Sequence, residues 1–171
     1  MSRNDPGAAG PEFSHVLRAH EIGGVTRRVE LAANDGERAA LARRFGLLVL
    51  TGLTAVLEVK REAAWIRVSG TVRGEGDQAC VASGDPVPFR LVEPVMLRLA
   101  EPPAAGEIEL AADDLDVEPL DGDIVDLGEI AAQALALGLD PYPRRPGSVA
   151  GILSEDEAAA ARSPFAVLKK G

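Results

Sequence analysis

Residues 121–146 read DGDIVDLGEIAAQALALGLDPYPRRP and contain the clearest helix signals in the chain. Asp126 stands at an N-cap position, and Glu129 three residues later matches the pattern of a capping box. Gly138 and the prolines after it are typical of a helix end. The apolar residues between them recur at helical spacing and predict one apolar face: Ile130, Ala131, Ala134, Leu135 and Leu137. We expect this helix to cover an open sheet face, and capping explains both carboxylates better than catalysis does.

A second helix is predicted between Asn34 and Gly46. Asn34 occupies an N-cap position with Glu37 at the matching capping-box position, and Gly46 marks the end. Apolar residues share one side of this helix: Ala40, Leu41 and Phe45. The arginines of the segment lie off that side, so the helix is expected to be amphipathic.

Near the N-terminus, two segments alternate between apolar and polar residues. Residues 13–19 read FSHVLRA and residues 26–32 read TRRVELA, with a turn signal at residues 22–24 between them. This pattern predicts two strands that pair with each other in antiparallel fashion.

The middle of the chain predicts a hairpin and a further strand. Residues 54–60 and 65–73 form the expected hairpin, with a tight turn at residues 61–64. Its alternating apolar positions are Val56, Ile66, Val68 and Val72. Residues 88–99 also alternate, and Pro94 within them indicates an edge strand or a bulge.

These elements together predict an α+β fold: a mainly antiparallel sheet or partly closed barrel with two covering helices and flexible termini. Residues 12–146 are expected to form a single domain of this kind. Residues 1–11 are polar and rich in Gly and Pro, so we expect them to be disordered. Residues 147–171 are expected to form a linker, a short helix and a C-terminal tail.

Charge is distributed unevenly along this chain of net charge −9. Residues 1–74 contain 11 Lys and Arg against 8 Asp and Glu, whereas residues 75–171 contain 7 against 19. No basic residue lies between Arg98 and Arg144, so this segment should repel phosphate. A solvated acidic face and a docking site for a basic partner both account for it.

Several features favour a cytoplasmic protein. No stretch is long and apolar enough to span a membrane, and the first residues lack the apolar core of a signal peptide. The single cysteine, Cys80, fits a reducing compartment. We therefore expect no membrane contact.

Two groups of residues are candidates for binding a partner. The first is the basic cluster that includes Arg27, Arg28, Arg43 and Arg44, which is either a solvated face or a contact for nucleic acid. The second is the tail, where Phe165 and Leu168 are candidates to enter an apolar groove on a partner while Lys169 and Lys170 contact its acidic rim. A tail that completes the domain's own core is an equal alternative.

No catalytic constellation is predicted, so we expect a protein that is not an enzyme and has no cofactor. His15 and His20 lack a third ligand for a metal and a nucleophile for hydrolysis. The glycines at positions 70, 74 and 76 do not lead into a helix, as those of a phosphate-binding loop do. Five aspartates, Asp113, Asp114, Asp116, Asp121 and Asp123, do not have the spacing of an EF-hand and favour a flexible acidic loop.

Three segments in order resemble the YceD family, the large ribosomal RNA subunit accumulation proteins. Residues 70–100, GTVRGEGDQACVASGDPVPFRLVEPVMLRLA, resemble its central segment of a G-x-V strand, a Cys turn and a Pro-Val strand. Residues 125–147, VDLGEIAAQALALGLDPYPRRPG, resemble its helix followed by P-x-P, and residues 163–170, SPFAVLKK, resemble its ending. Many relatives have a second cysteine and further Cys or His residues at positions where this chain has Ser83, Arg144 and Arg145. A zinc site is therefore not expected here, because structural zinc needs four ligands.

The resemblance implies a non-enzymatic factor that supports synthesis, processing or stability of large-subunit (23S) ribosomal RNA in bacterial ribosome biogenesis. Its expected partner is ribosomal RNA or a ribosome-assembly protein, and no contact with DNA is expected. The alternative is a small acidic adaptor that binds a basic protein, such as a ribosomal protein, without direct RNA contact.

Overall fold

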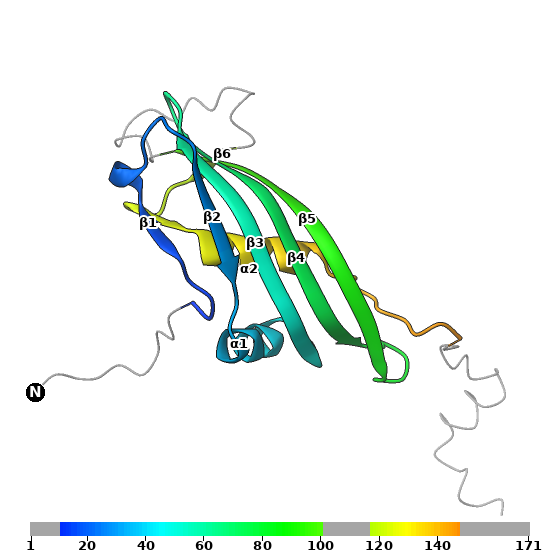
Figure 1. The fold of residues 1–171 in the computed structure, drawn as a ribbon. Helices are drawn as coiled ribbons and strands as arrows, with labels where there is room; N and C mark the ends of the chain where they lie inside the picture. Colours follow the sequence, from blue (N-terminus) through cyan, green and yellow to red (C-terminus); the bar gives the residue numbers. More distant parts are fainter. Residues whose placement is uncertain (1–10, 101–116, 148–171) are drawn as a thin grey trace, which may run out of the picture.

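The computed structural model describes residues 11–100 and 117–147 (Figure 1). Its elements, in chain order, are β1 (Val16–Arg18), the 3-10 helix η1 (Ala19–Glu21), β2 (Arg27–Ala32), α1 (Asp35–Phe45), β3 (Val49–Arg61), β4 (Ile66–Ala79), β5 (Pro86–Ala100), β6 (Val117–Pro119), β7 (Ile124–Asp126) and α2 (Leu127–Gly138). The expectations for residues 1–10 and for the C-terminal tail fall outside the described residues.

One five-stranded sheet organises the described chain. Its strand order is β2-β3-β4-β5-β6, with antiparallel pairing from β2 to β5 and parallel pairing of β6 with β5. Helix α2 crosses one face of the long strands, and α1 packs near one end of β3 (Figure 1). The α+β prediction is therefore confirmed. The partly closed barrel is wrong: the sheet stays open, because α2 occupies the face that a barrel would enclose.

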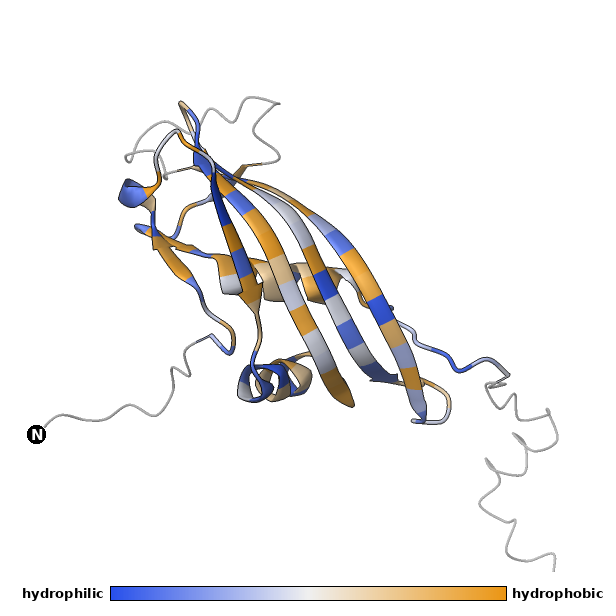
Figure 2. Ribbon diagram, viewed as in Figure 1, coloured by the Kyte–Doolittle hydropathy of each residue, from blue (hydrophilic) through white to orange (hydrophobic). Residues whose placement is uncertain are grey.

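The core lies between the sheet and α2, and strict alternation builds it (Figure 2). The buried side of β3 carries Leu53, Ala55, Leu57 and Val59, and that of β4 carries Ile66, Val68 and Val72. The sequence predicts Val56 among the apolar positions of the hairpin, but Val56 lies on the opposite face of the sheet and is half-buried. The hairpin itself is confirmed, and both strands extend beyond the predicted ranges.

The first strand pairs differently from the prediction. β1 is antiparallel to β7, with Leu17 opposite Val125, whereas β2 pairs with β3. Both of these opposed side chains are buried, and the Leu127 backbone N–H donates to the His15 carbonyl at 2.9 Å. The pair therefore secures the N-terminal segment to the start of α2, which a local hairpin with β2 would not do.

The predicted helix starts are confirmed at both N-caps, but one capping box is wrong. Asn34 and Glu37 form a reciprocal capping box on α1. Asp126 accepts hydrogen bonds from the backbone N–H groups of Gly128 and Glu129. The Glu129 carboxylate binds Arg44 and not the backbone N–H of the N-cap residue. Two charge-assisted hydrogen bonds from a guanidinium are stronger than a single hydrogen bond from a backbone N–H.

The apolar face of α2 also differs from the prediction at one position. Ala131 and Leu135 are fully buried, and Ile130 and Ala134 are partly buried against the core. Leu137 is 87% exposed, because it lies beyond the side of the helix that faces the sheet.

Candidate functional site

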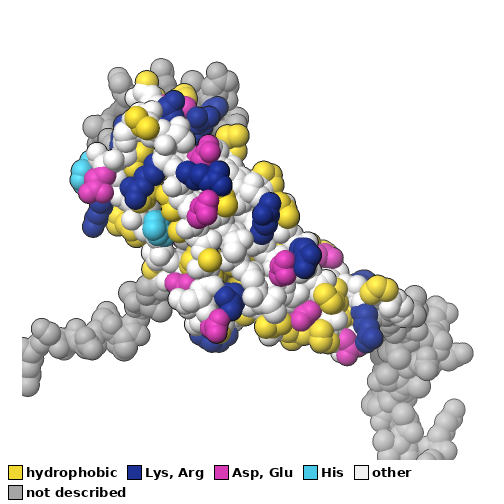
Figure 3. Space-filling model, in the orientation of Figure 1, with side chains coloured by type: hydrophobic (Ala, Val, Ile, Leu, Met, Phe, Trp, Pro, Cys, Tyr) yellow, Lys and Arg dark blue, Asp and Glu magenta, His cyan; other side chains and the backbone are white. Residues whose placement is uncertain are grey.

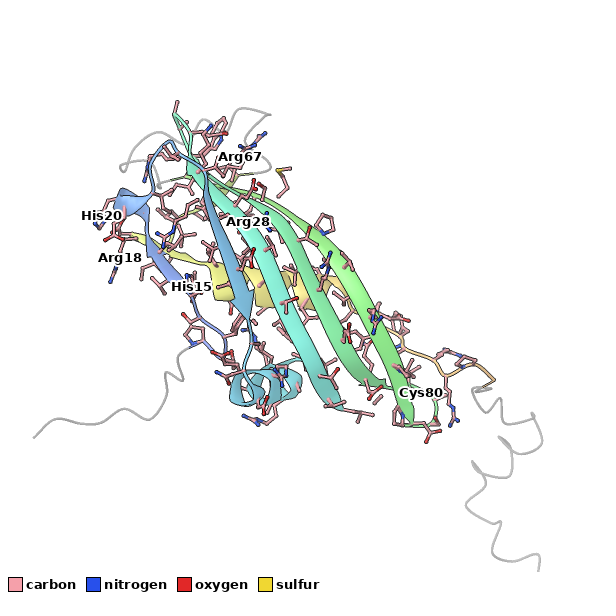
Figure 4. The ribbon with its side chains drawn as sticks, viewed as in Figure 1. His15, Arg18, His20, Arg28, Arg67 and Cys80 are labelled. Carbon is pink, nitrogen blue, oxygen red and sulfur yellow. The ribbon has the colours of Figure 1, made fainter. Side chains whose placement is uncertain are left out.

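Three basic residues lie side by side on the outer face of the sheet, the face opposite α2. Strand register places Lys60 on β3 opposite Arg67 on β4, and Arg67 opposite Arg98 on β5. We call these three residues the basic row. Figure 3 shows Lys and Arg side chains gathered toward the upper end of this face, and Figure 4 places Arg67 there, close to the hairpin turn.

Only part of the row's charge is compensated. Arg67 Nε lies 3.2 Å from Glu62 Oε1, and the guanidinium of Arg98 lies over the Trp65 ring at 5.2 Å from its centroid. Lys60 and Arg98 form no ion pair with any residue that the structure describes. Like charges directly opposite each other in a sheet destabilise it. The row is therefore not explained by stability, and it offers an anion at least two unpaired cations.

Trp65 gives the row an aromatic neighbour. Its indole N–H donates to Glu62 Oε2 at 2.8 Å, which fixes the ring beside the carboxylate that also holds Arg67. Met96, two residues before Arg98 on β5, lies on the same face and is 74% exposed. Farther along this face, Arg90 Nε lies 3.0 Å from Glu75 Oε1, whereas Arg73 is exposed without an ion pair to any described residue. The basic row is therefore distinguished by three basic residues on adjacent strands.

The arginines predicted as one basic cluster do not come together. Arg27 and Arg28 begin β2, whereas Arg43 and Arg44 end α1, which follows the opposite end of that strand. Arg28 lies on the outer face, 3.2 Å from Glu30. Arg43 is exposed, without an ion pair to any described residue. Nearness in the sequence did not predict nearness in space for these arginines. Strand β2 lies between the two pairs and holds them at opposite ends.

Arg44 has a structural contact instead of a free surface position. Its Nη1 and Nη2 lie 2.8 and 2.7 Å from the two carboxylate oxygens of Glu129, and Nη1 lies 3.1 Å from Glu12. The hydrogen bond to Glu129 raises the pKa of Arg44. The hydrogen bonds from Arg44 lower the pKa of Glu129 against an opposing effect of burial. This bidentate pair connects α1 to α2.

The pair predicts a specific pH dependence. Because the pKa of Glu129 is lower in the folded chain than its ordinary 4.5, the ionised carboxylate stabilises the fold above that pH. Glu129→Gln should lower the free energy of unfolding by about 1 kcal/mol at neutral pH. The difference from the wild type should shrink as pH falls below 4.5. Urea unfolding across this range measures it, with Glu58→Gln as the control; a difference independent of pH would contradict the assignment.

Phe165, Leu168, Lys169 and Lys170 lie outside the described residues. No three His, Cys, Asp or Glu side chains gather as metal ligands within residues 11–100 and 117–147. His20 pairs with Asp123, and the pKa of that carboxyl is lowered, because hydrogen bonds from His20 outweigh the opposing effect of desolvation.

Cys80 is buried in the turn between β4 and β5. The segment after α2 lies against this turn: the Val81 backbone N–H donates to the Pro143 carbonyl at 2.9 Å, and the Arg145 N–H approaches Cys80 Sγ at 3.5 Å. Ser83 Oγ and Arg145 Nη1 both contact Asp85 Oδ2, at 2.9 and 3.4 Å. Two segments far apart in the sequence, both singled out by the family resemblance, therefore meet in space.

Sequence reasoning missed the basic row, although the predicted hairpin contains both Lys60 and Arg67. Pairing across the predicted turn at residues 61–64 would place Lys60 opposite Trp65, whereas the observed turn lies one residue later and places Lys60 opposite Arg67. Arg98 joins them only through the register between β4 and β5, which the sequence did not specify.

No helix in the described part of the chain is long and apolar enough to cross a membrane. Comparisons with protein-family models, with curated proteins and with solved structures found no match to this chain.

Proposed function

We propose that this chain is a non-enzymatic, cytoplasmic factor that binds RNA through the basic row and supports synthesis, processing or stability of large-subunit ribosomal RNA. The observation that carries the RNA contact is the row itself. Lys60 and Arg98 have no acidic partner among the described residues, and they lie beside Arg67 on an open sheet face. Phosphate oxygens are the ligands that such cations bind, and this contact requires no particular base sequence.

Trp65 supports RNA as the partner over a free phosphate. Its ring lies at the same end of the sheet as the row, under Arg98. Single-stranded RNA presents unstacked bases beside its phosphates, and aromatic side chains stack on such bases. One tryptophan beside three cations is suited to binding a few nucleotides of single-stranded RNA.

The net charge of −9 does not exclude this contact. At physiological ionic strength charges are screened over about 8 Å, so a phosphate responds to the nearest side chains more than to the whole protein. On the outer face Glu30 is paired with Arg28 and Glu75 with Arg90, whereas Glu58, two residues from Lys60 on β3, has no ion pair with a described residue. Lys60, Arg67 and Arg98 still outnumber Glu58 and Glu62 at the hairpin end.

The ribosomal role rests on the resemblance of three ordered segments to the YceD family. The contact between the Cys80 turn and the segment around Pro143 supports it, because the family's additional Cys and His residues fall in these two segments. Ser83 and Arg145 occupy that place here and bind Asp85 instead.

Recovery of RNA from a cell lysate tests the proposal. The tagged wild-type chain should recover large-subunit ribosomal RNA, and ribonuclease should abolish recovery of associated ribosomal proteins. The variant Lys60→Gln/Arg67→Gln/Arg98→Gln should lose most of the RNA. A matched control, Arg18→Gln/Arg27→Gln/Arg43→Gln, removes equal charge from exposed arginines that have no ion pair within the described chain and should behave as the wild type. Equal RNA recovery by both triple variants would contradict the proposal.

A further inference from the structure

A second surface, separate from the basic row, lies along the outer edge of β5. This strand pairs with β4 over its whole length, from Pro86 opposite Ala79 to Leu99 opposite Ile66. On its other side, β6 pairs only with Arg98, Leu99 and Ala100. Residues 86–97 of β5 therefore present an edge that no other strand of the described chain covers.

The regular register shows which backbone groups point outward from this edge. Ala100 directs its carbonyl to the edge side, where it accepts from the Leu120 N–H at 2.7 Å. Even-numbered residues of β5 share this direction, because backbone groups alternate along an antiparallel strand. Pro86, Pro88 and Pro94 belong to this set, so none of them removes a bond to β4. The outward N–H donors that remain are those of Arg90, Val92 and Met96.

An apolar groove of about 190 Å³ lies between this edge and α2. Its walls include Val95 and Leu97 from β5 and Ile130, Ala134 and Leu137 from α2. The volume is smaller than the roughly 300 to 1,000 Å³ typical of small-molecule sites, and it suits the side chains of a peptide. Leu137 is 87% exposed and therefore adds little to the core. Its place in the wall of the groove accounts for an apolar residue at this position.

Two carboxylates, of Glu93 and Glu118, also line this groove. Neither forms an ion pair with any described residue. Glu93 also lies against the last turn of α2: a Cβ added at Gly138 would come within 2.7 Å of its Oε1. Helix C-termini carry partial negative charge, and α2 has no basic residue in its last turn. The surroundings of Glu93 therefore attract a cation that the described chain does not supply.

We propose that the edge of β5 and this groove bind an extended segment of a basic partner protein. The segment adds a strand beside residues 90–96 through the outward backbone groups, and it inserts an apolar side chain between β5 and α2. Lysine or arginine residues two positions before and after that side chain meet Glu93 and Glu118. Backbone bonds supply affinity, and the cation-apolar-cation pattern supplies selectivity.

A second copy of this chain fits the edge less well. Three prolines remove N–H donors from the edge, and prolines at an edge strand oppose pairing with another copy. A partner peptide needs only the donors of Arg90, Val92 and Met96.

Binding of two synthetic peptides to the full chain tests this inference. One peptide has Lys, Leu and Lys at alternate positions separated by Thr, and the other has Glu in place of both Lys. Fluorescence anisotropy should give at least about tenfold tighter binding of the Lys peptide, since each ion pair in a half-buried groove contributes a few-fold. Hydrogen exchange at the Arg90, Val92 and Met96 amides should slow only with the Lys peptide. Equal binding of the two peptides, or unchanged exchange, would overturn the proposal.

Variants locate the binding. Glu93→Gln/Glu118→Gln and Leu137→Ala should each weaken binding of the Lys peptide by about fivefold or more, whereas Leu48→Ala, which truncates a leucine 51% exposed far from the groove, should not. A wild-type dimer that Leu137→Ala dissociates would assign the edge to a second copy instead. Peptide binding only after deletion of residues 163–171 would assign the groove to the chain's own tail. The peptide-binding assay contains no RNA, so its result does not depend on whether the basic row binds RNA.

Discussion

Leu135→Ala should lower the free energy of unfolding by about 2 to 5 kcal/mol. Leu135 is fully buried, and it packs directly onto the sheet: a Cβ added at Gly74 would come within 2.3 Å of Leu135 Cδ1. The glycine on β4 thus leaves room for this leucine, and truncation to alanine opens a cavity between helix and sheet.

Denaturant unfolding measures the effect, with Leu137→Ala as the matched control on the same helix. Leu137 is 87% exposed, so its truncation should change the free energy of unfolding by less than about 0.5 kcal/mol. Equal effects of the two substitutions would show that α2 does not lie on the sheet by the face described.

Gly70→Ala should cost about 3 kcal/mol, because the added methyl group meets the backbone of the neighbouring strand. Gly70 has φ +156, and its Cβ would lie 2.1 Å from the Val56 carbonyl oxygen and 2.9 Å from Leu57 Cα. Backbone atoms of a paired strand cannot move aside as a flexible side chain does. The substitution therefore destabilises the pairing of β3 with β4 at the centre of the sheet.

Gly52→Ala is the control for this prediction. Gly52 lies in β3, the partner strand of Gly70, and the nearest atom to a Cβ added at Gly52 would be Glu75 Cβ at an ordinary 3.8 Å. Thermal unfolding should show a large drop in melting temperature for Gly70→Ala and a small change for Gly52→Ala. Similar melting temperatures for the two variants would contradict the close approach of β3 and β4 at Gly70.

Local chemistry explains which parts of the fold were predictable. The N-caps at Asn34 and Asp126 act within three residues, so the sequence contains all of the interacting atoms. The β3–β4 hairpin is similarly local. Pro94 correctly indicated an edge, since β5 has no second neighbour among the described strands at that position.

Long-range pairing explains what the sequence could not specify. β1 and β7 are three residues each and more than 100 residues apart, so neither the length nor the spacing of the segments indicates their pairing. The same limit applies to Glu129: capping and a bond to Arg44 are both open to it, and only the position of α1 decides between them. Residues with two chemically reasonable partners are where sequence reasoning is weakest.

The candidate site follows the same rule. The predicted arginines were grouped by nearness in the chain, whereas the basic row is grouped by register across three strands. The predicted apolar position at Val56 would put Lys60 on the core side of β3, because the two residues share one face of that strand. The presence of Arg98 beside Arg67 depends on the order of the sheet.

The salt dependence of RNA binding tests the central claim, that the basic row contacts phosphates, most directly. Affinity for a single-stranded fragment of large-subunit ribosomal RNA is measured over a range of salt concentrations for the wild type and for Lys60→Gln/Arg67→Gln/Arg98→Gln. Each phosphate contact to a single strand contributes about 0.7 to the slope of log K against log salt. The variant should therefore have a slope shallower by about 2, with weaker binding at low salt. An unchanged slope would contradict the claim.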